Sequence, residues 1–135
     1  MAIKKAGCFL INLENKTIAI VYRESKNDYS FPKGHVEGDE DLIEAAIRET
    51  AEETKRNAKV LTNIDPLLNK YSNTKEGDCE CYLYFALDDG PSDNDSLDTH
   101  PTFWIPIDEV EDKLTYDNNK EIWRIAKEII KGEIL

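Results

Sequence analysis

The segment FPKGHVEGDEDLIEAAIRETAEETK, residues 31–55, carries the most informative pattern in this chain. It begins with proline and glycine, which favour a turn, and from Leu42 onward apolar residues recur at helical spacing. Three glutamates, Glu49, Glu52 and Glu53, follow on the predicted helix. Because positions three and four apart share a helix face, their carboxylates gather in one small area and repel one another. The crowding favours a positive group among them.

A solvated acidic face is the alternative interpretation of this helix. It does not account for the rigid turn at Pro32, or for the glycines Gly34 and Gly38 that flank the turn and the helix. Hard divalent cations take carboxylate oxygens as ligands, and Mg²⁺ usually shares them with substrate phosphates. The segment therefore predicts a site for a metal-bound polyphosphate.

The ends of this helix are also predicted from the sequence. Asp39 can cap the first turn, and the acids that follow it suit the positive end of the helix dipole. We expect the helix to run to about Lys55 or Arg56, with Asn57 as a left-handed stop.

Strands are predicted on both sides of this helix. An opening hairpin is expected first, and an amphipathic helix over residues 118–131 closes the chain. Mixed strands and two main helices indicate an α/β (α+β) sandwich. The predicted strands cover residues 6–13, 17–23, 58–62, 67–72, 79–87 and 102–107.

Composition restricts the function. The chain has 135 residues, 40% hydrophobic and 33% charged, which predicts a single globular domain over residues 1–135. Asp and Glu number 28 against 17 Lys and Arg, and this acidity argues against a stable nucleic-acid complex. No apolar run has membrane-spanning length and no signal peptide is recognisable, so we expect a cytoplasmic protein without membrane association. The three cysteines are expected to be free thiols.

The spacing of the polar residues resembles the Nudix box, G-x5-E-x7-R-E-U-x-E-E-x-G-U, in which U is aliphatic. Gly34, five residues, Glu40, seven residues and then RETAEE at positions 48–53 follow this pattern, so the box spans about residues 34–56. The order of predicted elements is also that of the Nudix fold. The resemblance implies an α/β/α sandwich with a mixed sheet between helices.

Three positions depart from the box. Thr50 and Arg56 stand where the family has aliphatic residues, and Lys55 stands where a glycine ends the helix. We expect these changes to let the helix continue past its usual stop, and to leave the carboxylates upstream unaffected.

The resemblance assigns roles to individual residues. It implies that Glu49, Glu52 and Glu53 bind Mg²⁺ or Mn²⁺, and that Glu49 or Glu53 also acts as the general base. Arg48 is implied to orient and neutralise the carboxylates during catalysis, with Glu40 as its partner and with Gly34 beside them; an ordinary surface ion pair is the alternative for Arg48.

The sequence PKGHVE at positions 32–37 resembles that of asymmetrical diadenosine tetraphosphate hydrolases, and also that of diphosphoinositol polyphosphate phosphohydrolases. Lys33 and His35 would then face the phosphate chain, although a structural hydrogen bond is the alternative for His35. Asp98 lies six residues before Trp104, where the diadenosine enzymes have a glutamate, and is a candidate outer metal ligand. An ordinary loop acid is the alternative.

Three tyrosines are candidates for stacking on a nucleotide base. Tyr82 and Tyr84 share one face of a predicted strand, and Tyr116 precedes the last helix. Packing within the core is the alternative for each.

The predicted reaction is Mg²⁺-dependent hydrolysis of a pyrophosphate bond in a nucleoside diphosphate linked to another moiety, foremost diadenosine tetraphosphate to ATP and AMP. The alternatives are nucleoside triphosphates, nucleotide sugars or capped RNA as substrate, and a Nudix-fold module that binds nucleotides without cleaving them. Such a module would be expected to lack box glutamates, which this chain retains. The predicted partner is a small nucleotide polyphosphate, and the sequence leaves the oligomeric state open.

Overall fold

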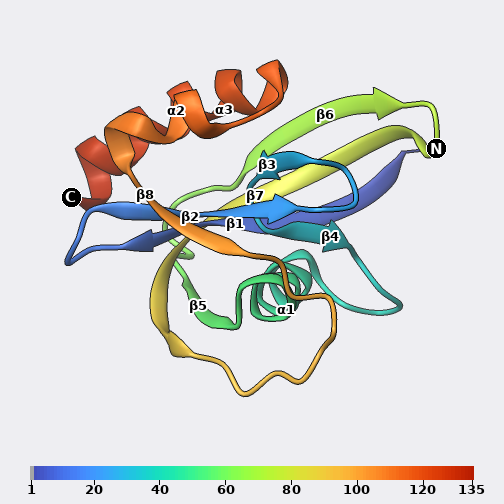
Figure 1. The fold of residues 1–135 in the computed structure, drawn as a ribbon, viewed down its shortest axis with the longest axis horizontal. Coiled ribbons are helices and arrows are strands. Elements are labelled where there is room, and N and C mark those ends of the chain that lie inside the picture. Colours follow the sequence, from blue (N-terminus) through green and yellow to red (C-terminus); the bar gives the residue numbers. More distant parts are fainter. Residues whose placement is uncertain (1) are drawn as a thin grey trace.

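One mixed β-sheet runs through the centre of the molecule, between two helical layers (Figure 1). The computed structural model describes residues 2–135. Helix α1 (Leu42–Thr54) covers one face of the sheet, and the C-terminal helices α2 (Val110–Lys113) and α3 (Asp117–Ile129) cover the other. The predicted α/β/α sandwich is therefore confirmed.

Within residues 2–135 the sheet has eight strands, with the order β3-β2-β1-β7-β5 along its main path. Strand β4 pairs with β1, β6 with β7 and β8 with β2. The central strands β1 and β7 are parallel, and the other pairs are antiparallel. The strand bounds are β1 (Ile3–Asn12), β2 (Thr17–Arg23), β3 (Asp28–Ser30), β4 (Lys33–His35), β5 (Arg56–Val60), β6 (Leu67–Asn73), β7 (Gly77–Pro91) and β8 (Thr102–Pro106). Short helical turns cover Ile107–Glu109 and Ile130–Ile134.

The two faces of the sheet carry side chains of different size. Alternate residues of a strand point to opposite faces, so Phe9 packs toward α3 with Phe31 and Trp123, whereas its neighbour Cys8 packs toward α1. The α1 face is built largely from small side chains: Ala6, Cys8, Ala19, Ala45, Ala46, Ala58 and Ala86. Because these side chains are short, α1 lies close to the sheet, and its glutamates come next to β4.

Helix α1 begins two residues later than predicted. Asp41, not Asp39, is its N-cap, since the Asp41 carboxylate accepts a hydrogen bond from the Glu44 amide at 2.8 Å. The Glu44 carboxylate accepts in turn from the Asp41 amide at 3.0 Å. This reciprocal capping box satisfies amides that the first turn of a helix leaves free.

The other end of α1 also differs from the prediction. The helix ends at Thr54, because Lys55 adopts a left-handed φ of 60° and its amide donates to the Ala51 carbonyl oxygen. Lys55 thus takes the backbone conformation that the box glycine would take. The expected extension past Lys55 is wrong, and Asn57 already lies within β5.

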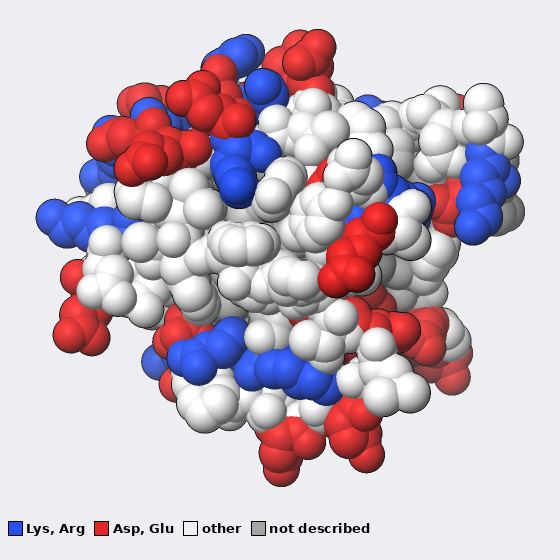
Figure 2. All heavy atoms as spheres, viewed as in Figure 1, with Lys and Arg blue, Asp and Glu red and all other residues white. Residues whose placement is uncertain are grey.

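The expectation for the cysteines is met. Cys8, Cys79 and Cys81 are buried free thiols. Within residues 2–135, no helix is long and apolar enough to cross a membrane. Figure 2 shows a broad band of uncharged side chains over the region of β2 and β8, between the charged groups of the C-terminal helices and those around α1.

The capping box gives a direct stability test. Asp41→Ala should lower the free energy of unfolding by about 1 kcal/mol, because it removes the N-cap acceptor. Asp39→Ala is the matched control and should change it by less than about 0.5 kcal/mol, the usual range for a surface substitution. Urea unfolding followed by tryptophan fluorescence measures both; a larger loss in the Asp39 variant would contradict the assigned helix start.

Candidate active site

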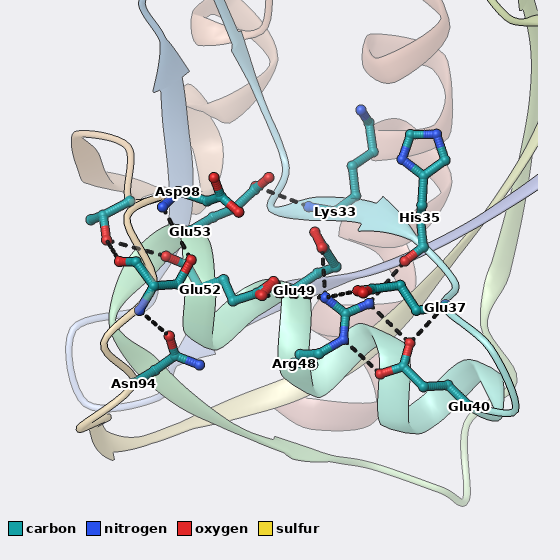
Figure 3. A network of polar contacts seen from close by, with 12 residues as sticks. Lys33, His35, Glu37, Glu40, Arg48, Glu49, Glu52, Glu53, Asn94 and Asp98 are labelled. Atoms are coloured by element: carbon teal, nitrogen blue, oxygen red, sulfur yellow. Dashed lines mark hydrogen bonds and ion pairs between the residues drawn. The ribbon is translucent and has the colours of Figure 1, made fainter.

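The guanidinium of Arg48 lies at the centre of the acidic cluster on α1 (Figure 3). Its Nε and Nη2 atoms donate to the two carboxylate oxygens of Glu40, at 2.6 and 2.9 Å. Nη1 donates to Glu49 at 2.9 Å and to Glu52 at 2.8 Å, and Nη2 also donates to the carbonyl of His35 at 2.9 Å. The bond from Arg48 lowers the pKa of Glu40. Arg48 therefore joins the loop before the helix to two box glutamates and partly neutralises them.

Two glycines let the backbone pass close to this cluster. A Cβ atom at Gly34 would overlap the carboxylate of Glu49, and a Cβ atom at Gly7 would overlap the Pro32 carbonyl oxygen. Both glycines lie where β4 pairs with β1. A side chain at either position would push β4 or Glu49 away. Gly34 was expected from the box spacing; Gly7 was not, because only the pairing of β1 with β4 brings it here.

Glu53 has the least exposed side chain of the box glutamates. Burial, and then the charge of Glu49, raise the pKa of Glu53 to about 8. Its carboxylate accepts from the Lys33 amide at 3.2 Å, and the His100 ring lies 3.8 Å away. Burial also raises the pKa of Glu49. Two desolvated carboxyl groups thus stand together on one helix face, and the bond from Arg48 to Glu49 offsets their loss of solvent only in part.

This donor set fits a hard divalent cation. The available ligands are carboxylate oxygens, which Mg²⁺ and Mn²⁺ accept, and the crowded carboxylates of Glu49 and Glu53 would gain from a cation between them. Within residues 2–135, no group of three His, Cys, Asp or Glu side chains already stands in a metal-binding arrangement. Arg48 binds one carboxylate oxygen of Glu49 and both of Glu52, and both side chains line the cavity.

A cleft next to the glutamates is lined by cationic side chains. It consists of two adjoining cavities of about 420 and 550 Å³, which share several wall residues. The second cavity is lined by Glu49, Glu52 and Glu53. The cationic residues common to both cavities are Lys5, Arg23, Lys26, Lys33 and Lys75. Desolvation in the cleft lowers the pKa of Lys33. In a chain of net charge −11, this grouping is a local concentration of positive charge, which suits a polyanion.

Glu76, in the turn between β6 and β7, contacts both Lys5 and His35 at the wall of the cleft. Its carboxylate accepts from Lys5 Nζ at 2.8 Å and lies 2.6 Å from His35 Nε2. The Lys5 bond, and then the His35 contact, lower the pKa of Glu76 to about 2. The His35 ring is still 58% exposed, so it lines the cleft while making the structural contact considered as its alternative role.

The loop of residues 92–100 brings Asp98 to the glutamates (Figure 3). The His100 amide donates to the Glu53 carbonyl oxygen at 2.9 Å, and the Thr99 hydroxyl donates to the Glu52 carbonyl oxygen at 3.3 Å. Asp98 lines the same cavity as the box glutamates. His100 was not predicted, although its position two residues after Asp98 in a polar loop was a usable signal.

Two of the three candidate tyrosines lie away from the cleft. Tyr116 lines the cleft, and its hydroxyl donates to Asp28 at 2.7 Å. Tyr84 is buried in the cluster under α1 and Tyr82 packs beside it, so neither lines the cleft. The shared face of the two tyrosines was right, but that face of β7 points to α1. Tyr71 on β6 was missed; it lines the cleft, with the Lys5 ammonium 5.6 Å from its ring centre.

An α/β/α sandwich with box-spaced carboxylates on its first helix defines a Nudix protein. The chain matches the NUDIX domain family over residues 1–126, and it belongs to that family, the Nudix (MutT-like) hydrolases.

Individual relatives agree with this assignment. A Mycobacterium tuberculosis protein that carries the name MutT4 is 33% identical over 116 residues, which are 84% of this chain and 46% of that protein. The chain thus spans about half the length of this curated relative. A structure of a C. elegans Ap4A hydrolase binary complex superposes with a TM-score of 0.81 at 22% identity, covering 97% of this chain and 99% of that one. A Francisella tularensis NMN adenylyltransferase/ADP ribose pyrophosphatase, complexed with AMP and a manganese ion, has a TM-score of 0.66 at 23% identity, covering 95% and 42%.

The burial of Glu53 gives a pH-dependent stability test. Its pKa is about 8 in the folded chain and 4.5 as the ordinary value, so the stability from its retained proton is complete below the ordinary value and is lost as the pH rises through 8. In metal-free protein, Glu53→Gln should therefore raise the melting temperature at about pH 9 and change it little at about pH 4, below the ordinary value.

Scanning fluorimetry in excess chelator measures this difference. Glu14→Gln, in the exposed turn after β1, is the matched control and should have no such pH dependence. A Glu53→Gln protein that is equally destabilised at both pH values would show that the carboxylate is already ionised and paired.

Proposed function

We propose that this chain hydrolyses a pyrophosphate bond in a nucleotide polyphosphate with the help of Mg²⁺ or Mn²⁺. We infer diadenosine tetraphosphate, cleaved to ATP and AMP, as its preferred substrate. The observation that supports the proposal best is the shared cleft, in which box glutamates from α1 face cationic side chains from the strands and loops around it. A substrate with several phosphates suits this cleft, because it needs a cation at the carboxylates and further positive charge along the chain of phosphates.

The carboxylates would do the chemistry at one end of the cleft. A divalent cation held by Glu49, Glu52 and Glu53 would neutralise phosphate oxygens and make water a better nucleophile. Glu53 and Glu49 are the candidates for accepting the proton of that water, since both are buried carboxyl groups with raised pKa values. Arg48 would keep Glu49 and Glu52 in place before the cation binds.

The cationic groups would hold the rest of the substrate. Arg23 is fixed for this by Asp28, whose carboxylate accepts from Nε at 2.7 Å and from Nη2 at 2.6 Å. Lys33 lines both cavities. Tyr71 and Tyr116 line the cavity of about 420 Å³, which does not contain the glutamates of α1. Their aromatic rings suit a nucleoside.

The dinucleotide is favoured by the PKGHVE sequence at positions 32–37, which resembles that of diadenosine tetraphosphate hydrolases. The C. elegans Ap4A hydrolase supports the fold and no more, because its identity to this chain is low. A binding module without catalysis is disfavoured, since every box glutamate is present.

A substrate panel tests the proposal. Purified protein is incubated with Mg²⁺ and diadenosine tetraphosphate, ATP, ADP-ribose or capped RNA, and the products are separated by ion-exchange chromatography. We expect the dinucleotide to be cleaved fastest and to yield ATP and AMP. Two molecules of ADP would show a symmetric attack that the proposal does not allow. Faster cleavage of another member of the panel, with no cleavage of the dinucleotide, would assign the site to that substrate.

The box glutamates give a second test of the same chemistry. Glu52→Gln and Glu53→Gln should each lower kcat by two or more orders of magnitude, a rough scale for the loss of a catalytic group. Excess chelator should abolish turnover, and added Mg²⁺ or Mn²⁺ should restore it. Glu14→Gln should retain normal turnover. Near-normal rates in folded Glu52 and Glu53 variants would show that these glutamates form a solvated acidic face and take no part in catalysis.

A further inference from the structure

Lys55 has a backbone conformation that its side chain does not favour. Its φ of 60° and ψ of 29° lie in the left-handed region, where a Cβ atom is close to the following carbonyl. The Nudix box has glycine at this position, which would adopt the same conformation freely. A lysine here therefore needs a compensating interaction.

The side chain supplies that interaction. The Lys55 ammonium donates to the carbonyl oxygen of Asn94 at 2.6 Å and to that of Ser96 at 2.7 Å. The Lys55 carbonyl oxygen accepts from the Ser92 amide at 2.9 Å, so the backbone and the side chain of one residue bind the same loop. The ammonium thus donates only to backbone carbonyl oxygens, and the loop bends around it.

The loop is shaped to surround this ammonium. Its side chains accept from backbone amides two residues ahead at three successive places: Ser92 from Asn94, Asn94 from Ser96, and Ser96 from Asp98, at 3.1, 2.8 and 3.1 Å. These turns keep the carbonyls of residues 94 and 96 directed at the lysine, and they end at Asp98.

Beyond Asp98 the loop follows the last turn of α1. Its contacts to the carbonyl oxygens of Glu52 and Glu53 join it to the residues that carry the box carboxylates. Lys55 and these contacts thus hold the loop at both ends, with Asp98 between them in the cavity of the glutamates.

We propose that Lys55 is a positioning residue, whose ammonium holds the loop of residues 92–100 so that Asp98 takes part in divalent-cation binding. This inference rests on the proposed function of the site, but its test does not depend on turnover. The geometry predicts that removal of the ammonium weakens cation binding. It also predicts that the end of the helix is stable without a lysine at this position.

Two substitutions separate these roles. Lys55→Met keeps the Cβ atom and the left-handed conformation and removes the ammonium, whereas Lys55→Gly removes the ammonium and also relieves the backbone. We expect both to weaken Mn²⁺ binding by about tenfold, the lower end of the range for loss of a group that orients a ligand. Lys55→Gly should nonetheless melt at or above the temperature of the unaltered protein, because glycine suits the helix end. A purely structural role for Lys55 would not lower cation affinity while preserving stability.

The measurement is Mn²⁺ titration of the nucleotide-free protein by electron paramagnetic resonance, with hydrogen exchange of the peptide that covers residues 92–100. Asp98→Asn should weaken Mn²⁺ binding to a similar extent, and Lys55→Met combined with Asp98→Asn should be no weaker than Asp98→Asn alone. Exchange in the loop should rise in both Lys55 variants. Lys59→Met, an exposed lysine on β5, is the control and should change neither quantity.

Three results would overturn the proposal: unchanged Mn²⁺ affinity in both Lys55 variants, unchanged affinity in Asp98→Asn, or fully additive effects of the two sites. A failure of the protein to cleave the dinucleotide would count against the proposed substrate and would leave the Mn²⁺ and exchange results to decide the role of Lys55.

Discussion

The ion pairs around Arg48 hold the site together. Glutamates from α1 and from the loop before it share one guanidinium, which also binds the His35 carbonyl oxygen at the end of β4. Such a network stabilises a structure only when its members are satisfied, because an unpaired charge in a partly buried place is costly. Every nitrogen of the Arg48 guanidinium has an acceptor, and these bonds join α1, β4 and the intervening loop.

The close packing of α1 makes that network possible. Small side chains between α1 and the sheet let the helix lie near β4, and glycines at positions 7 and 34 remove the Cβ atoms that would separate them. The opposite face, with its interlocking aromatic rings under α3, supplies the large side chains of the core. One face of the sheet thus provides much of the buried apolar volume, while the other brings backbone and carboxylates close together.

Charged side chains are also distributed unevenly over the molecule. The chain as a whole is strongly acidic, yet the cleft gathers lysines and an arginine opposite the glutamates of the helix. A polyanion would therefore meet local attraction within a molecule that repels it at long range. Salt weakens the long-range repulsion more than the contacts inside the cleft, since buried charges are screened less. The fixed position of Arg23 against Asp28 keeps one of these cations ready without a change of conformation.

Short stretches of the chain were enough to predict the first helix, the spacing of its carboxylates, the two-helix sandwich and the family. A helix repeats every few residues, so its faces follow from local spacing. The rest of the cleft follows only from the tertiary fold, because Lys5, Arg23 and Tyr71 come from separate strands. The tertiary fold also turned Tyr84 toward α1 and set the end of the helix at Lys55, whose strained backbone is offset by a loop about forty residues away. Strand pairing and loop contacts join residues that are distant in the sequence. A local pattern therefore does not predict which face of the sheet a residue occupies or which partner it contacts.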